Sequence, residues 1–310
     1  MGVVGPTVPP SGEQFEILAG SQRATVTEVG ATLRTYVVGG VDVLDGFEEA
    51  EPSNAGRGQI LAPWPNRLED GRYTFEGVAG RAALDEPDRG NAIHGLVRWL
   101  PWRVTSRSPS AVALGCVLHP QPAYPWRLEL GVEYSIDEAG LTVAAAASCL
   151  SEAAAPFGIG FHPYLTLGSA TIDKAHVTIP ARTRLEADER GLPAGEVDVE
   201  GDFDFRAAKP IERIELDTGY TNLIRSEDGR VRVNVELAGG DRGLTLWADE
   251  AFDYLMVYTG HSLEPQSRRR QGLAVEPMTC PPNAFRSGRD IARLAPGGRW
   301  RGTWGIQPRA

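Results

Sequence analysis

Apolar and polar residues alternate along most of this chain, in short segments that are separated by turn signals. The clearest example is the segment 230–248, where valine occupies every second position from Val231 to Val235. The apolar pattern resumes at Leu244 after the polar, Gly-rich stretch AGGDRG. A period of two residues is typical of strands with one buried face, and a Gly-rich interruption between two such runs indicates a turn. We therefore predict a β-hairpin here.

Two further segments carry the same signal, and one segment conflicts with it. Residues 24–44 alternate and contain Gly39-Gly40 at a hairpin position, and residues 71–80 alternate around a polar turn. The segment 143–156 is rich in alanine, the residue with the highest helix propensity. Because it follows directly on a strand pattern, we predict a strand, a loop and a second strand for it rather than a helix.

Composition supports a fold made of many short strands. The 310 residues include 36 Gly and 23 Pro with no Gly-X-Y period, and 42% of the residues are hydrophobic. An excess of Gly and Pro indicates many turns, and this apolar content suffices for a sizeable core. We found no internal repeat, linker or domain boundary. The sequence predicts an all-β protein, a single large antiparallel β-sandwich that spans residues 1–310 as one domain.

The charge balance limits the kinds of partner. The formal net charge is −10, which argues against a nucleic-acid or an anionic-membrane partner, because both require a clustered basic surface. The one basic run, at residues 268–270, is short and lies near acidic residues. We expect it to be a solvated loop.

Cysteine usage and the N-terminus bear on the compartment. Cys116, Cys149 and Cys280 form no CxxC pair, which fits a reducing compartment and excludes a disulfide framework. The N-terminus lacks the basic start and apolar segment of a signal peptide, and Pro6 stands where myristoylation requires Ser or Thr. The most apolar stretch, residues 141–150, is too short to cross a bilayer as a helix. These features predict a cytoplasmic location.

Two stretches place an ionisable residue before a proline in an otherwise apolar run. They are GIGFHPYL, which contains His162, and LAVEPMTC, which contains Glu276. A strand that ends at the rim of a pocket would aim such a side chain into the pocket. The alternatives are a buried histidine bonded to a carbonyl group and an edge-strand carboxylate beside a proline that blunts the edge. The local pattern leaves these interpretations open.

Other polar residues in unusual settings are Asn66 and Arg67, which follow a stiff Pro-Trp-Pro, His94 before a glycine, and Asp217 before Thr-Gly. Arg67 could pair with a carboxylate on a neighbouring strand, and Asp217 could close an Asx turn. The sequence contains no zinc-ligand spacing, no phosphate-binding glycine loop and no complete nucleophile elbow. We therefore expect no metal, nucleotide or other cofactor.

The order of these motifs resembles that of the aldose 1-epimerases, the galactose mutarotase family. The motifs are an Asn-Arg after a Pro-rich strand, an Asn-x-x-His-Gly, a Gly-x-His-Pro-Tyr and a late Glu-Pro, spread over residues 58–285. The resemblance implies a galactose mutarotase-like supersandwich with a sugar bound in a groove across one sheet. It also implies a small-molecule sugar as partner, no cofactor, and a monomer or homodimer.

The resemblance also implies roles for individual residues. His162 matches the family's general acid and Glu276 its general base. The residues that match the lining of the sugar site are Asn66, Arg67, His94, Tyr164 and, on a looser motif, Asp217. Met278 follows Glu-Pro where many members carry glutamine. This difference indicates a divergent branch and leaves the preferred sugar open.

The residue types fit the implied chemistry. Exchange of the α and β anomers of a pyranose removes the proton of the C1 hydroxyl and protonates the ring oxygen. Ordinary pKa values of about 4.3 for Glu and about 6.5 for His provide a base and an acid near neutrality. We expect this pair on opposite sides of the sugar, with Trp64 offering a ring face to it.

Two alternative functions remain. A hexose-6-phosphate 1-epimerase would bind the phosphate through additional basic residues, for which Arg72 and Arg98 are the candidates. A non-catalytic carbohydrate-binding protein would keep the fold without turnover. Because a binding protein needs neither a general acid nor a general base, the presence of both residue types favours an enzyme.

Overall fold

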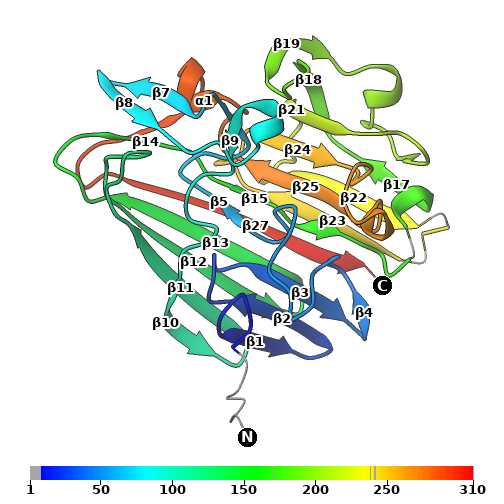
Figure 1. The fold of residues 1–310 in the computed structure, drawn as a ribbon. Helices are drawn as coiled ribbons and strands as arrows, with labels where there is room; N and C mark the ends of the chain where they lie inside the picture. Colours follow the sequence, from blue (N-terminus) through cyan, green and yellow to red (C-terminus); the bar gives the residue numbers. More distant parts are fainter. Residues whose placement is uncertain (1–7, 170, 238, 241, 310) are drawn as a thin grey trace, which may run out of the picture.

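The computed structural model describes residues 8–169, 171–237, 239–240 and 242–309, and two large sheets dominate it (Figure 1). In spatial order, the nine-stranded sheet contains β10 (Arg103–Ser108), β11 (Ala111–Leu118), β12 (Leu128–Asp137), β13 (Gly140–Cys149), β27 (Arg299–Arg309), β23 (Gly243–Ala248), β22 (Val231–Leu237), β17 (Ala175–Thr178) and β20 (Lys209–Pro210). The eight-stranded sheet contains β19 (Pro193–Asp198), β18 (Ala181–Ala187), β21 (Asp217–Leu223), β24 (Tyr254–Tyr258), β25 (Leu273–Met278), β15 (Gly160–Phe161) and β5 (Ile60–Leu61), with β16 (Tyr164–Leu165) also paired to β25.

Smaller elements surround these sheets. A four-stranded sheet contains β1 (Gln14–Ala19), β2 (Gln22–Thr27), β3 (Leu33–Val38) and β4 (Val41–Asp42). Three ribbons pair β6 (Arg67–Glu69) with β9 (Asn91–Ile93), β7 (Arg72–Phe75) with β8 (Val78–Arg81), and β14 (Ala155–Phe157) with β26 (Ala292–Leu294). The helical turns are α1 (Ala284–Ser287), η1 (Pro87–Arg89), η2 (Ile172–Lys174), η3 (Gly201–Phe203) and η4 (Gln266–Arg268).

The two large sheets share one hydrophobic core. Phe161 of β15 contacts Trp304 of β27 with 5.3 Å between ring centroids, which joins the eight-stranded sheet to the nine-stranded one. Every second residue of β12, from Leu128 to Ile136, is buried, as the alternating pattern requires of a strand with one covered face. Strands that are neighbours in each sheet pair in the antiparallel sense. The prediction of an all-β antiparallel sandwich is confirmed.

The predicted hairpins are also present. The strands β22 and β23 pair as expected, although Ala238 and Asp241 in their connection lie outside the described residues. Gly39-Gly40 joins β3 to β4 with φ of 57° and 81°. The turn between β7 and β8 has the same two-residue length. Two-residue loops with positive φ match the right-handed twist of the strands they join, which is why glycine is favoured there.

The alanine-rich segment forms strands, as predicted. The strand β13 continues to Cys149, a loop follows, and β14 begins at Ala155. The strand β13 pairs with β12 on one side and with β27 on the other. Hydrogen bonding and packing on both sides outweigh the helix propensity of alanine, which amounts to only a few tenths of a kcal/mol per residue.

The prediction of a solvated loop at residues 268–270 is wrong. All three arginines are at least partly buried, and they pair in chain order with the carboxylates of Asp45, Glu264 and Asp173. Two of these carboxylates, Asp45 in a loop and Asp173 in η2, are far away in the sequence, so the local pattern carried no sign of them. The run ties the loop before β25 to the rest of the fold.

Other expectations concern cysteines and the chain's N-terminus. Cys116, Cys149 and Cys280 are free thiols in this structure, and Cys149 and Cys280 are buried. The prediction on a leader segment falls mostly on residues 1–7, which lie outside the described part of the chain. Among the residues that are described, none belongs to a helix with the length and apolar character needed to traverse a bilayer.

Candidate active site

The strand β25 is buried along its whole length, unlike strands that have one solvent-facing side. Leu273 and Val275 join the main core. Because side chains alternate along a strand, Glu276 points to the opposite face of the sheet. That face is covered by loops, so the Glu276 side chain is only 2% exposed.

His162 lies between β15 and β16 and faces Glu276. Its Nε2 atom is 3.3 Å from Oε1 of Glu276. The backbone N–H of His162 donates to the carbonyl oxygen of Gln59, and the N–H of Gly58 donates to the carbonyl oxygen of His162. The backbone of His162 is therefore tied to residues 58–59, which lie about a hundred residues earlier in the sequence.

The ribbon of β6 and β9 brings His94 and Asn66 to the same place. Both residues have positive φ, 64° for His94 and 56° for Asn66, and the N–H of His94 donates to the carbonyl oxygen of Asn66. The ring of His94 lies 5.3 Å from the ring of His162, edge to face. The side-chain oxygen of Asn66 accepts a hydrogen bond from the N–H of Arg67.

Arg67 is fixed by two carboxylates and one glycine. Its guanidinium donates three hydrogen bonds to Glu86, the shortest of 2.9 Å, and its Nη2 atom lies 3.6 Å from Oδ2 of Asp217. A Cβ atom at Gly191 would lie 2.5 Å from Nη1 of Arg67, so only glycine allows this close approach. Asp217 is the first residue of β21 rather than part of an Asx turn. Arg67 does pair with carboxylates, which is the structural role that its sequence context also allowed.

Tyr164 lies beside His162, with its ring stacked 4.9 Å from the imidazole and 9° from parallel. Its hydroxyl donates to the carbonyl oxygen of Ala55 at 3.0 Å. The expectation for Trp64 is wrong. Trp64 is 2% exposed and packs against Phe285 in the main core, because the Pro-Trp-Pro segment turns its indole inward.

Seven residues were selected from the sequence, and direct contacts in the structure bring six of them together. Asp217 joins the six through Arg67. Three buried polar atoms in this group have no hydrogen-bond partner among the described residues. They are Oε2 of Glu276 and the Nδ1 atoms of His94 and His162. Buried polar atoms are nearly always paired in folded proteins, so such a cluster is suited to hydrogen bonding with water or with a polar ligand.

Burial shifts the pKa values of the facing pair in opposite directions. Burial, followed by the positive charge of Arg57, lowers the pKa of His162 to about 3. Burial and the carboxylate of Asp217 raise the pKa of Glu276 well above its ordinary value, against the opposing effect of Arg67. Burial and the neighbouring His162 lower the pKa of His94 as well, so that ring is neutral.

These two groups titrate as a pair, because they are within hydrogen-bonding distance. With one proton between them they form either a neutral imidazole and a carboxylic acid or an imidazolium and a carboxylate. Burial favours the first form, and the 3.3 Å contact favours the second. The expectation of ordinary pKa values for Glu276 and His162 is therefore corrected.

The position of the pair also differs from expectation. We expected the acid and the base on opposite sides of a sugar, but they are neighbours. The two oxygens that exchange protons in anomer exchange are both bonded to C1. Adjacent groups can therefore reach both oxygens from one side, which makes opposite placement unnecessary.

Sequence reasoning missed several residues that build the site. Arg57 lies over the ring of Tyr164. Glu86 and Gly191 both contact Arg67. Gly56 lies directly against the His162 ring, where an added Cβ would be 2.5 Å from Cδ2. The only signal in the sequence was the Gly-Arg-Gly at residues 56–58, where two glycines flank an arginine.

The two candidate phosphate ligands lie in different places. Arg72 belongs to the exposed ribbon of β7 and β8, where it lines a hollow with Arg286. Arg98 is close enough to lower the pKa of His94 and His162, but its Nη2 atom pairs with Asp85. Within the part of the chain that the structure describes, no group of three or more His, Cys, Asp or Glu side chains is placed to hold a metal ion.

Comparisons with known proteins identify similar sequences over most of the chain. A family model described as "Aldose 1-epimerase" matches residues 13–307. The chain is 33% identical over 290 residues to the uncharacterized protein YihR of Escherichia coli (strain K12), a match that covers 93% of this chain and 90% of YihR. It is 27% identical over 290 residues to galactose mutarotase of Bos taurus, covering 84% of this chain and 81% of that protein.

Solved structures show the same fold. The GalM/aldose epimerase homologue from C. elegans matches with a TM-score of 0.86 at 18% identity, covering 96% of this chain and 98% of that one. A putative aldose 1-epimerase from Escherichia coli K12 matches with a TM-score of 0.82 at 17% identity, covering 96% and 99%. At these identities the structural matches establish the sandwich architecture.

Proposed function

Because this chain belongs to the aldose 1-epimerase family, we propose that it interconverts the α and β anomers of a free hexose, with Glu276 and His162 as its acid–base pair. The observation that carries this proposal is the buried contact of 3.3 Å between Nε2 of His162 and Oε1 of Glu276. Each of them also has a polar atom without a partner among the described residues. Positioned acids and bases of this kind contribute about 10²–10⁴ each to a rate.

The proton balance of the pair matches that of the reaction. The Glu276 carboxylate takes the proton of the C1 hydroxyl, and the His162 imidazolium gives its proton to the ring oxygen as the bond from C1 to that oxygen breaks. An open-chain aldehyde results, and the pair becomes a carboxylic acid and a neutral imidazole. After rotation about the C1–C2 bond, the reverse transfers close the ring from the other face. Burial favours the neutral pair that these transfers produce, and the 3.3 Å contact favours the ionised pair from which they start.

The remaining residues of the site can bind the sugar hydroxyls. Arg67 and Asn66 offer donors on one side, and Asp217 offers an acceptor that is 35% exposed. His94 is neutral, so it can donate from one ring nitrogen and accept at the other.

The test is anomer exchange with purified protein. We expect polarimetry of freshly dissolved α-glucose and α-galactose to show relaxation well above the spontaneous rate, and NMR exchange spectroscopy at equilibrium to show the same. Glucose 6-phosphate is the third substrate, because faster exchange of this sugar alone would favour the hexose-6-phosphate alternative. Sugar binding without any acceleration would favour a binding protein and overturn the proposal.

Removal of divalent metal ions should leave the rate unchanged. The proposed proton transfers use only His162 and Glu276, so dialysis against EDTA should remove nothing that the reaction needs. The measurement is the exchange rate before and after dialysis, with the melting temperature as a check on the fold. A rate that falls and returns on adding one particular divalent ion would contradict the mechanism.

Replacement of Arg67 or His94 by alanine should weaken sugar binding. A lost hydrogen bond to a charged group costs about 1.5–3 kcal/mol, so KM should rise about ten- to a hundredfold for Arg67→Ala. For His94→Ala we expect KM to rise only about tenfold, because the His94 ring that is lost is neutral. Arg232→Ala removes a half-buried arginine of β22, in the nine-stranded sheet, that pairs with Asp228, and it should leave KM unchanged. A variant with normal KM and a much lower melting temperature would assign that residue a structural role only.

A further inference from the structure

The buried Arg57 has no part in the proton transfers proposed above, and its burial requires an explanation. Its side chain is only 1% exposed. Its Nη2 and Nε atoms lie 3.2 and 3.4 Å from Oδ2 of Asp45, and Nη1 donates to the side-chain oxygen of Asn54. Burying an ion pair costs desolvation free energy that the pairing only partly offsets. Such a pair is therefore weak evidence of a role in stability alone.

Arg57 is connected to His162 through the ring of Tyr164. The guanidinium carbon of Arg57 lies 4.6 Å from the centroid of the Tyr164 ring, and that ring stacks on the imidazole at 4.9 Å. The guanidinium is therefore within about 10 Å of the imidazole. At this distance, with an effective dielectric constant of about 20, one unit charge changes a pKa by about one unit.

The loop that carries Arg57 also touches both rings. The carbonyl oxygen of Ala55 accepts the hydrogen bond of the Tyr164 hydroxyl, and the backbone of Gly56 lies against the imidazole. The bonds from Arg57 to Asn54 and Asp45 close this loop around the stacked rings. Arg57 is thus placed to affect both the orientation and the charge of His162.

We propose that Arg57, held by Asp45, is a positioning residue for His162, and that its positive charge opposes protonation of the imidazole so that a bound proton is readily given to the sugar. The inference rests on the proposed role of His162 as proton donor. Arg57 itself touches neither the sugar nor the reacting atoms in this scheme.

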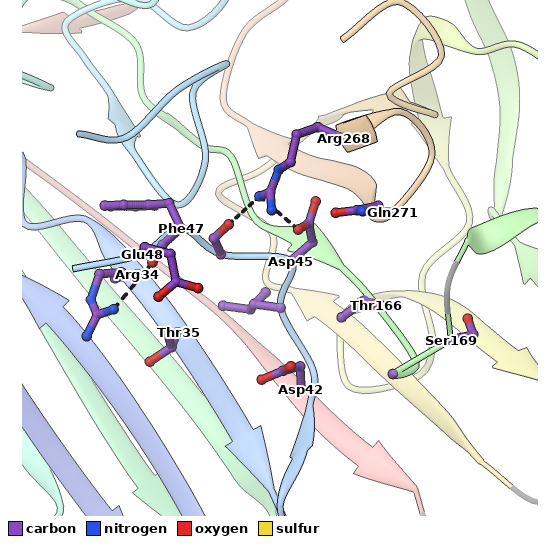
Figure 2. Close-up of a pocket in the computed structure, with 13 residues that line it drawn as sticks. Arg34, Thr35, Asp42, Asp45, Phe47, Glu48, Thr166, Ser169, Arg268 and Gln271 are labelled. Carbon is purple, nitrogen blue, oxygen red and sulfur yellow. Dashed lines mark hydrogen bonds and ion pairs between the residues drawn. The ribbon is translucent and has the colours of Figure 1, made fainter. Parts of the chain in front are cut away.

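Asp45 determines how strongly the positive charge of Arg57 acts on His162. Its Oδ2 atom faces Arg57, while its Oδ1 atom lies 3.0 Å from Nη2 of Arg268. Figure 2 shows Asp45 and Arg268 on the wall of a separate pocket of about 410 Å³. One carboxylate thus stands between two arginines, and it neutralises part of the charge of Arg57.

Among the residues that the structure describes, few charged or titratable groups surround His162. They are Glu276 on β25, His94 after β9, Tyr164 on β16, Arg98 and Arg57. After burial, Arg57 has the largest electrostatic effect on the pKa of His162, and it lowers this pKa. Removing the charge at residue 57 should therefore raise the pKa, and removing the balancing charge at residue 45 should lower it further.

The experiment compares Arg57→Met, Arg57→Lys and Asp45→Asn with the parent protein. The readouts are the pH dependence of kcat/KM for anomer exchange and the titration of the His162 ring by NMR, assigned with His162→Asn. Arg57→Met should move the His162 titration up by about one pH unit relative to Arg57→Lys, which keeps the charge. Asp45→Asn should move it down, and KM should change little in any of the three.

A matched control is Arg225→Met, which removes a partly buried arginine paired with Asp253 beyond the far end of β21. It should change neither readout. The inference is overturned if the His162 ring has the same pKa in Arg57→Met and Arg57→Lys. It is also overturned if Arg57→Met and Asp45→Asn shift the pKa of His162 in the same direction. Absence of turnover in the parent would count against the proposed function, while the NMR titration would still decide the effect of Arg57 on His162.

Discussion

Glu276→Gln should lower kcat for anomer exchange by about 10²–10⁴ while the affinity for sugar stays nearly unchanged. Glutamine keeps the size of glutamate and can still contact Nε2 of His162, which lies 3.3 Å away. It cannot accept the proton of the C1 hydroxyl. The measurements are exchange rates by NMR and sugar titration of the folded variant.

The companion variant His162→Asn tests the other half of the pair. It should reduce kcat by a similar factor, and the double variant should lose little more than the worse single variant, because ring opening needs both transfers. Glu236→Gln is the matched control, since Glu236 pairs with Arg309 on the surface of the other sheet. Exchange at the parental rate in Glu276→Gln would remove this residue from the mechanism.

Gly56→Ala should reduce kcat by at least about a hundredfold, although no group that reacts is changed. A Cβ at residue 56 would lie 2.5 Å from Cδ2 and 3.0 Å from Nε2 of His162, so the ring must move away from its present position. A displacement of about 1 Å in a catalytic group can cost about 10² in rate. The variant's exchange rate and a crystal structure would test this.

The control for Gly56→Ala separates contact from backbone strain. Gly77 has φ of 81°, close to the 77° of Gly56, but no atom lies within 4 Å of a Cβ built there. Gly77→Ala should therefore carry the strain of a left-handed alanine, about 1–2 kcal/mol, without loss of kcat. Equal loss of kcat in both variants would show that strain rather than displacement of His162 is responsible.

Local patterns predicted the parts of the fold that local physics determines. The turn at Gly39-Gly40 follows from the conformations that glycine can adopt, and the alternation in the β22–β23 segment follows from one buried face. The motifs around His162 and Glu276 were visible because a proline follows each of them. The structure places both on the same covered face of one sheet.

Features that depend on distant segments were not predictable in this way. The adjacency of His162 and Glu276 comes from the pairing of β15 and β16 with β25. Asp45 meets Arg57 and Arg268 through loop contacts that no local pattern signals. For the same reason the direction in which Trp64 points was misjudged, since its position is decided by Phe285 more than two hundred residues away.

The central position of β27 has a consequence for biosynthesis. Arg299–Arg309 lies between β13 and β23, and in Figure 1 it crosses the middle of the nine-stranded sheet. Among the described strands it is the last to leave the ribosome. Until it does, β13 and β23 each present an unpaired edge, which is a template for pairing with other chains. Closure of the nine-stranded sheet therefore waits for the synthesis of β27, and a nascent chain that stalls before Arg299 would be a target for chaperones or proteases.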